Sequence, residues 1–138
     1  MLEAIIRQSI LHDIVHFGLR IVAGFAFVFH GFEKFDSVFA SYMPSFGIPI
    51  ELQIPIALAE IIPGILLIIG ILSRISSSLL SVIMMGAIFV VLKASSYSGQ
   101  MGFEYPLILL VANLAVIVIG PGRISLSHGI KRIPRFLQ

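Results

Sequence analysis

The chain has 138 residues, of which 58% are hydrophobic and only 12% are charged, and its mean hydropathy is +1.07. Because a soluble domain carries about 25% charged residues, this composition excludes an ordinary water-soluble domain and predicts one integral membrane domain over residues 1–138. The absence of cysteine excludes disulfide, thiol-relay, iron–sulfur and zinc-thiolate chemistry within the chain, and a net charge of +2 is too small to indicate a nucleic-acid partner.

The first predicted element is a short amphipathic helix. Residues 1–13 (MLEAIIRQSILHD) place apolar side chains on one helical face, which is typical of a helix lying in the membrane interface. Runs of about 20 apolar residues predict membrane spans. Four such runs follow, at 14–35, 53–72, 75–95 and 105–119. The sequence therefore predicts an all-α membrane protein, a bundle of four transmembrane helices with an N-terminal interfacial helix.

The connections between the spans differ in character. Residues 36–53 contain two prolines and a glycine among aromatic residues, so we expect them to lie in the interface rather than to span. The sequence SRISS (73–77) predicts a tight turn, and residues 95–106 form a second turn-rich connection. The tail, 123–138, is basic.

The basic residues predict the orientation. Four spans place both termini and the turn at 73–75 on one side of the membrane. That side, with Arg20 near it, holds most of the basic residues: Arg7, Arg74, Arg123, Lys131, Arg132 and Arg135. Only Lys34 and Lys93 lie on the other side. By the positive-inside rule, we expect cytoplasmic termini in a multi-pass protein of the plasma membrane.

Ionisable residues gather at the predicted outer ends of the spans. They are His30, Glu33, Lys34, Glu60, Lys93 and Glu104. In the first span, the 3, 4, 3, 4 spacing from Arg20 through Ala23, Phe27 and His30 to Lys34 places one stripe toward the bundle interior. Glu60 lies roughly 10 Å inside the second span, and Pro63 cannot donate a hydrogen bond to the carbonyl of Ala59 beside it.

Three interpretations of this polar cluster remain open. It can contain an ion-paired structural knot of His30, Glu60, Lys93 and Glu104 that holds the helices in register, or it can form a small pocket that binds a small ligand, a quinone head group or a metal. In the third interpretation, Glu33, Lys34 and Glu104 only extend to water. Glu60 is the residue least able to do so.

Two further groups of polar residues are weaker candidates. HDIVH (12–16) spaces His12 and His16 one helical turn apart, but no third ligand is apparent, so we predict no metal site. Arg74 and Arg123 follow helix ends and are expected to anchor them structurally. Arg20 is a third structural anchor, unless its side chain extends to the cytoplasmic head groups.

Several of these residues resemble motifs of the DoxX family. Arg20, His30-Gly31 and Lys34 are similar to the family's first-helix pattern, and AEIIPGILLIIGILSR (59–74) resembles its second-helix signature. FEYPLILLVANLAVIVIGPGRISL (103–126) resembles its last helix, although Ser127 stands where an aspartate often follows. The resemblance covers about residues 17–127 and implies a four-helix membrane bundle associated with membrane oxidoreductase systems, since the family takes its name from a subunit of a thiosulfate:quinone oxidoreductase.

The first functional hypothesis is an accessory or quinone-associated, non-catalytic subunit of a membrane oxidoreductase complex. No cofactor-binding pattern is evident in the chain, and a quinone is the cofactor that the resemblance implies. The expected partners are the lipid bilayer and other subunits of the complex. One alternative is a small-molecule-binding or transporter-like membrane protein that uses the outer polar cluster, and another is a structural scaffold subunit. The sequence does not decide whether the chain is an enzyme.

Overall fold

The structure is a computed structural model that describes residues 9–130, 134, 136 and 137. The described residues form helices and turns and no β-strand. The elements are α1 (Ile10–Glu33), α2 (Ser37–Tyr42), the 3-10 turns η1 (Met43–Phe46) and η2 (Ile50–Leu52), α3 (Gln53–Ile69), α4 (Ser73–Gly86), the π-helical turn η3 (Ala87–Val91), α5 (Glu104–Ile119) and α6 (Leu126–Gly129).

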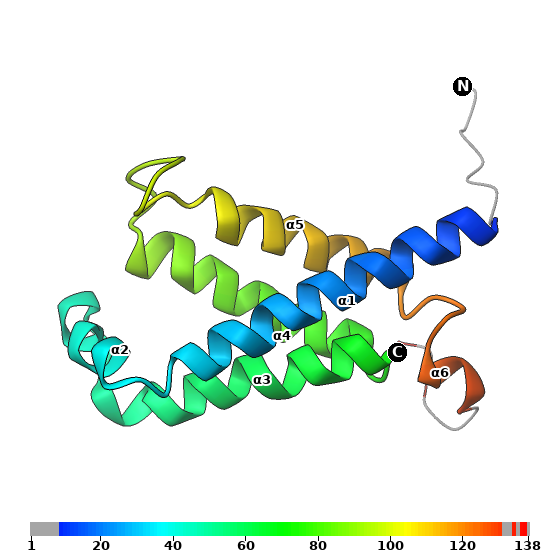
Figure 1. Cartoon of the computed structure of the whole chain (residues 1–138), viewed down its shortest axis with the longest axis horizontal. Helices are drawn as coiled ribbons and strands as arrows, with labels where there is room; N and C mark the ends of the chain where they lie inside the picture. Colours follow the sequence, from blue (N-terminus) through cyan, green and yellow to red (C-terminus); the bar gives the residue numbers. More distant parts are fainter. Residues whose placement is uncertain (1–8, 131–133, 135, 138) are drawn as a thin grey trace.

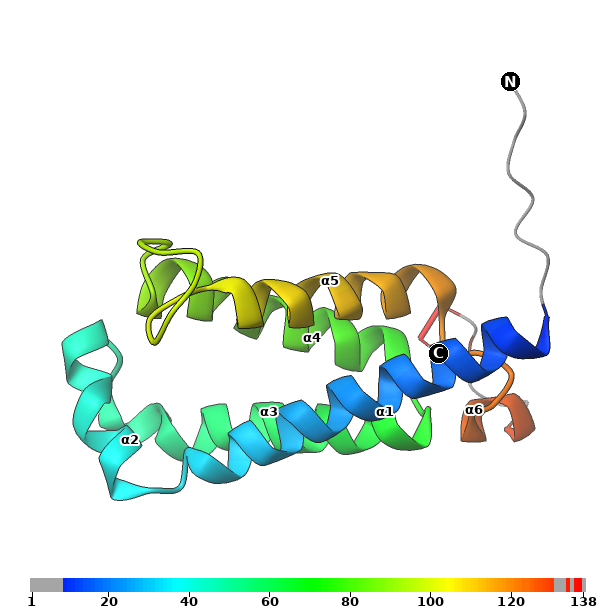
Figure 2. The same cartoon turned by 45° about the horizontal axis from the view of Figure 1, so that its top comes forward.

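Four of these helices, α1, α3, α4 and α5, lie side by side (Figure 1). α1 packs along α3 and α4 packs along α5, so the molecule has two layers of two helices, which Figure 2 shows. α3 also contacts α4, and α1 contacts α5, which closes the ring. At one end lie α2 and the connection that precedes α5. At the other end lie α6 and the start of α1.

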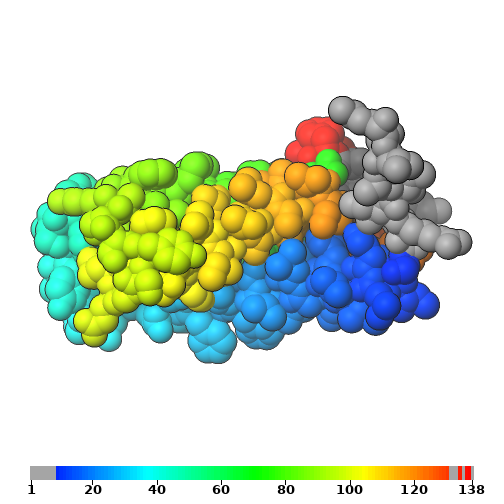
Figure 3. Space-filling view, turned by 90° about the horizontal axis from the view of Figure 1, so that it is seen from above, coloured from blue at the N-terminus to red at the C-terminus, as the bar shows by residue number. Residues whose placement is uncertain are grey.

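The helices have the dimensions and surface of membrane-spanning helices. Ile10–Glu33, Ile50–Ile69 and Ser73–Val91 are long and apolar enough to cross a bilayer, and α5 is apolar but has 16 residues. Large hydrophobic side chains such as Val22, Phe29 and Val118 are mostly exposed on the outer faces. Figure 3 shows the continuous face that α1 and α5 form. Such a surface indicates a lipid environment, and the chain is a membrane protein.

Close packing of α1 on α3 depends on glycine. A Cβ atom on Gly24 would lie 2.5 Å from the Ile68 side chain and 2.8 Å from the Gly64 carbonyl, and one on Gly31 would lie 2.9 Å from the Ala57 carbonyl. The two backbones therefore approach more closely than any larger residue allows. This contact sets the register between the polar residues of the two helices.

Several predicted boundaries change. α1 begins at Ile10, so residues 10–13 continue into the first long helix, while residues 1–8 of the predicted interfacial helix lie outside the described residues. The predicted turn at SRISS is wrong, because α3 ends at the left-handed Gly70 and the chain turns at 70–72. Ser73, Ser76 and Ser77 are buried in the first turns of α4.

Candidate functional site

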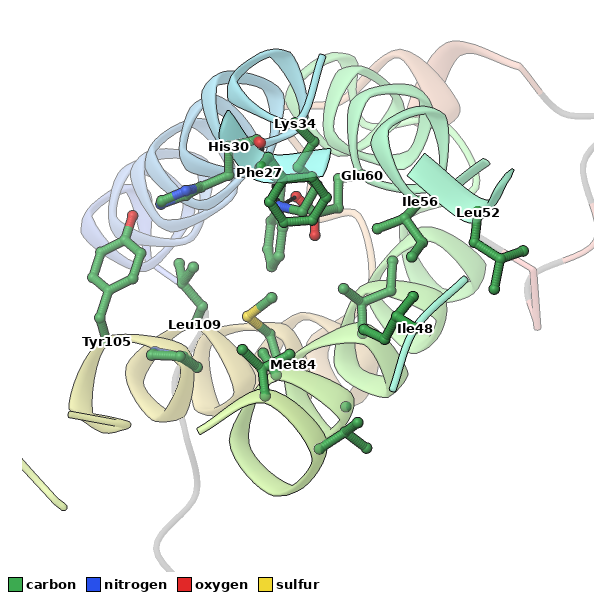
Figure 4. Close-up of a pocket in the computed structure, with 17 residues that line it drawn as sticks. Phe27, His30, Lys34, Ile48, Leu52, Ile56, Glu60, Met84, Tyr105 and Leu109 are labelled. Carbon is green, nitrogen blue, oxygen red and sulfur yellow. Dashed lines mark hydrogen bonds and ion pairs between the residues drawn. The ribbon is translucent and has the colours of Figure 1, made fainter. Parts of the chain in front are cut away.

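A cavity of about 500 Å³ lies between the four helices at the α2 end of the molecule. Most of its wall is apolar, and Figure 4 shows Phe27, Met84 and Leu109 around one side of the hollow. Ile48 and Leu52, from the segment between α2 and α3, cover another side. Pockets of this size and character are typical small-molecule sites.

An ion pair forms the polar part of the cavity wall. Lys34 Nζ at the C-cap of α1 donates to Glu60 Oε2 on α3 at 2.8 Å, and the side chains are 17% and 3% exposed. Lys34 Nζ also lies 3.3 Å from the His30 carbonyl and 5.4 Å from the centre of the Phe39 ring. The Gln53 side-chain amide donates to the Lys34 carbonyl at 2.8 Å, which holds the end of α1 against the start of α3.

The local sequence explains how these two groups meet. The predicted stripe on α1 faces inward: Arg20, Ala23 and Phe27 are buried, and the stripe continues into His30 and Lys34, which both line the cavity. On α3, Glu60 lies on the buried face one turn after Ala57, against which α1 packs. Because α1 and α3 pack so closely, Lys34 at the end of α1 reaches Glu60 on the buried face of α3.

His30 contributes an aromatic side chain to the same wall. Its ring centre lies 5.3 Å from that of Tyr105 on α5, which also lines the cavity, as Figure 4 shows. His30 Nδ1 lies 3.3 Å from Glu33 Oε2, but the Glu33 side chain is 74% exposed and does not line the cavity. His30 and Tyr105 therefore provide two further groups that can hydrogen-bond a ligand.

Lys93 and Glu104 do not join this site. Neither lines the cavity, and neither makes an ion pair with another described residue. Lys93 is exposed and has left-handed backbone, because η3 ends at Val91 and the chain then turns away from the bundle. Glu104 is the first residue of α5, and its neighbour Tyr105 lines the cavity while Glu104 does not.

The apolar wall contains residues that the sequence reasoning missed. Tyr105, Met84, Ile48 and Gly86 carry no polar spacing signal. A Cβ atom on Gly86 would meet nothing within 4 Å, because Gly86 faces the cavity instead of a neighbouring helix. The π-helical turn η3 widens α4 at the same level, which is a frequent feature of functional sites.

Arg20 lies at the opposite end of the bundle and is fully buried. Its Nη1 donates to the Leu67 carbonyl at 3.0 Å, and its Nη2 donates to the Ile124 carbonyl. Extension of Arg20 to the head groups is therefore wrong. The side chain instead connects α1 to the end of α3 and to the segment after α5, because the carbonyls there have no partner within their own helices.

The other two predicted anchors differ from each other. Arg123 pairs with Asp13 at 2.6 Å, and this hydrogen bond raises the pKa of the exposed Arg123 guanidinium. Arg74 is half-buried near Gly120, and its Nε has no hydrogen-bond partner among the described residues.

The two histidines of HDIVH have no metal-site geometry. His16 is buried and its Nε2 lies 2.6 Å from the Gly120 carbonyl, whereas His12 is half-buried. Over residues 9–130, 134, 136 and 137, no group of three or more metal-ligating side chains comes together. His16 therefore has a packing role at the junction of α1 and the end of α5.

The family of the chain follows from its similarity to a known family profile. The profile of the DoxX family matches residues 15–93, from α1 to the end of η3. The chain belongs to the DoxX family. The match contains Lys34 and Glu60, while the motif at 103–126 lies beyond it.

A curated relative supports the same assignment. The chain is 32% identical over 100 residues, covering 71% of this chain and 75% of the relative, to a protein of Bacillus subtilis (strain 168) named "Putative oxidoreductase CatD". No solved structure matches this DoxX-family chain significantly.

Proposed function

We propose that this DoxX-family protein is an accessory membrane subunit of an oxidoreductase complex, and that its cavity holds the head group of a quinone. Three observations support the proposal: the family, the oxidoreductase name of the Bacillus subtilis relative, and the cavity itself. The observation that carries it is the Lys34–Glu60 ion pair, which lies in the wall of a mostly apolar cavity.

The proposed arrangement in the membrane has four spans formed by α1, η2–α3, α4–η3 and α5. α5 is about 24 Å long at 1.5 Å per residue, shorter than the roughly 30 Å hydrocarbon core. Tyr105 at its outer end would lie near the interface, where aromatic side chains are stable. The basic end with Arg74 and Arg123 faces the cytoplasm, the plasma membrane is the location, and residues 1–138 form one domain.

The lining residues fit a quinone head group chemically. A quinone is a flat apolar ring with carbonyl acceptors, and it supplies two-electron, two-proton redox chemistry when bound. Lys34 Nζ can donate to a carbonyl oxygen while Glu60 compensates its charge, and Tyr105 Oη or His30 can donate from the α1–α5 side of the cavity. Phe27, Met84 and Leu109 exclude water from the ring.

Partner capture tests the proposal. The chain is purified in mild detergent from its native membrane, and the copurifying proteins and extracted lipids are identified by mass spectrometry. Redox subunits together with quinone are the expected result. A strictly monomeric chain that brings neither partner nor quinone would contradict both parts of the proposal.

A second candidate function is the binding or transport of another amphipathic small molecule. The cavity volume and its mixed lining favour this candidate as well. It predicts a ligand other than a quinone in the same extract, with no redox subunit copurifying. Substitution of Lys34 or Glu60 would then alter the amount of that ligand that copurifies with the chain.

A further inference from the structure

A groove lies at the opposite end of the molecule from the cavity, on the outer face of α4 and α5. It has a volume of about 570 Å³ and is lined by one arginine, one serine and apolar side chains: Arg74, Ile75, Ser78, Leu79, Val82, Ile117 and Phe136. Ile75, Leu79 and Val82 follow each other at intervals of 4 and 3 residues, so they form one apolar stripe along α4. The stripe leads away from the charge of Arg74.

Arg74 lies at the head of this groove and forms no ion pair with the part of the chain that the structure describes. Its Nε is buried and has no hydrogen-bond partner, and no carboxylate of the described residues forms an ion pair with it. The guanidinium lies beside the backbone of Gly120, where an added Cβ atom would lie 3.4 Å from Nη2. Because no described carboxylate pairs with this guanidinium, its Nη groups can donate to an anion that enters the groove.

The charges around the groove favour an anionic occupant. Among the described acidic residues, only Asp13 lies at this end, and Arg123 already neutralises it. The other described acidic residues lie toward the far end of the bundle: Glu33, Asp36, Glu51, Glu60 and Glu104.

We infer that this groove binds one anionic phospholipid. The phosphate accepts hydrogen bonds from the Arg74 guanidinium, and one acyl chain lies along Ile75, Leu79 and Val82 against Ile117. A cation at the head of an apolar stripe on a membrane-facing helix is complementary to a lipid with a negatively charged head group. The site differs from the quinone cavity in place and in chemistry, so it stands whether or not a quinone binds.

Native mass spectrometry of the whole chain in neutral detergent tests the site. Phosphatidylglycerol, phosphatidylcholine and inorganic phosphate are titrated separately. We expect phosphatidylglycerol to bind at least about tenfold more tightly than phosphatidylcholine, as one charge-assisted contact provides, and inorganic phosphate not to be retained. Retention of phosphate alone, or equal affinity for the two lipids, would overturn the proposal.

Three variants make the test specific. Arg74→Gln should lose the preference for phosphatidylglycerol, and Val82→Trp should weaken both lipids by filling the groove with the charge intact. Arg123→Gln removes a positive charge from the same end without touching the groove, and it should keep the preference. If Arg123→Gln loses the preference as Arg74→Gln does, the attraction is a general effect of charge and the groove is not a site. If Val82→Trp binds normally, the acyl chain lies elsewhere and the proposal fails.

Discussion

Lys34 Nζ and Glu60 Oε2 come from neighbouring helices and lie 2.8 Å apart, with the Glu60 side chain only 3% exposed. Two charges at this depth are stable only together, because each alone would lack water and a counter-ion. The pair therefore has a structural consequence, whatever ligand the cavity holds.

Removing one partner of this pair should cost more stability than removing both. Glu60→Gln leaves Lys34 without a counter-ion and should destabilise the protein by about 3 kcal/mol, whereas Lys34→Met combined with Glu60→Leu should recover most of the loss. Unfolding in mixed micelles gives the double-mutant cycle. Lys93→Gln, which removes an exposed lysine outside the cavity, is the control and should have little effect. Additive losses in the double variant would mean that the two side chains do not interact.

The glycine contact between α1 and α3 predicts opposite effects of two similar substitutions. Gly24→Ala places a methyl group 2.5 Å from Ile68 and should destabilise the protein by roughly 1–3 kcal/mol. Gly18→Ala is in the same helix but meets nothing within 4 Å, and should be neutral or stabilise by up to about 1 kcal/mol. Thermal unfolding of the two variants checks this prediction. Equal effects would show that α1 and α3 pack less closely than the structure indicates.

Sequence and structure agree best where a signal depends on one helix alone. The inward stripe on α1 follows from helical periodicity, so the sequence predicted it, and Glu60, the residue expected to be least able to extend to water, is buried. The partner of Glu60 was not predictable, because it depends on how closely α1 packs against α3 and on where the chain turns after η3. Lys93 lies just after η3, at the same end of the bundle as the cavity. The left-handed backbone of Lys93 and Ala94 turns the chain there, and the Lys93 side chain does not line the cavity.

The role of Arg20, at the opposite end of the bundle from the cavity, also depends on contacts between distant parts of the chain. Its position two turns inside the first span indicated either extension to the head groups or a structural role. The choice depended on the carbonyls of Leu67 near the end of α3 and of Ile124 in the segment after α5, which belong to distant parts of the chain. The apolar wall of the cavity gave no sequence signal, because apolar residues are expected everywhere in a membrane protein.

Arg20 should hold the segment after α5 in place. Arg20→Lys cannot reach both the Leu67 and Ile124 carbonyls, and losing a charged hydrogen bond of about 1.5 kcal/mol or more should speed local opening about tenfold. Hydrogen exchange at the Ser127 amide, which donates to the Gly70 carbonyl at 3.2 Å, reports this opening. Arg123→Gln is the control, because its exposed pair with Asp13 lies outside this contact. Unchanged exchange at Ser127 in Arg20→Lys would show that Arg20 does not secure the segment.

The proposed orientation can be tested directly, because the chain has no cysteine. Ser98→Cys lies in the exposed connection before α5, and His128→Cys lies in α6 at the opposite end. In intact cells, a membrane-impermeant maleimide should label position 98, and it should label position 128 only after permeabilisation. Labelling of position 128 in intact cells, and of position 98 only after permeabilisation, would show that the topology is the reverse of the proposed one.

The central claim is that the cavity beside Lys34 and Glu60 holds a quinone, and the quinone content of purified cavity variants tests it most directly. Gly86→Leu should fill the cavity without meeting a neighbouring helix, and Gly18→Leu adds the same side chain to α1 away from the cavity. Quinone is extracted from equal amounts of folded protein purified from native membranes and quantified by mass spectrometry. We predict that wild type and Gly18→Leu retain quinone and that Gly86→Leu loses most of it. Equal quinone in both variants, or none in the folded wild-type protein, would contradict the claim.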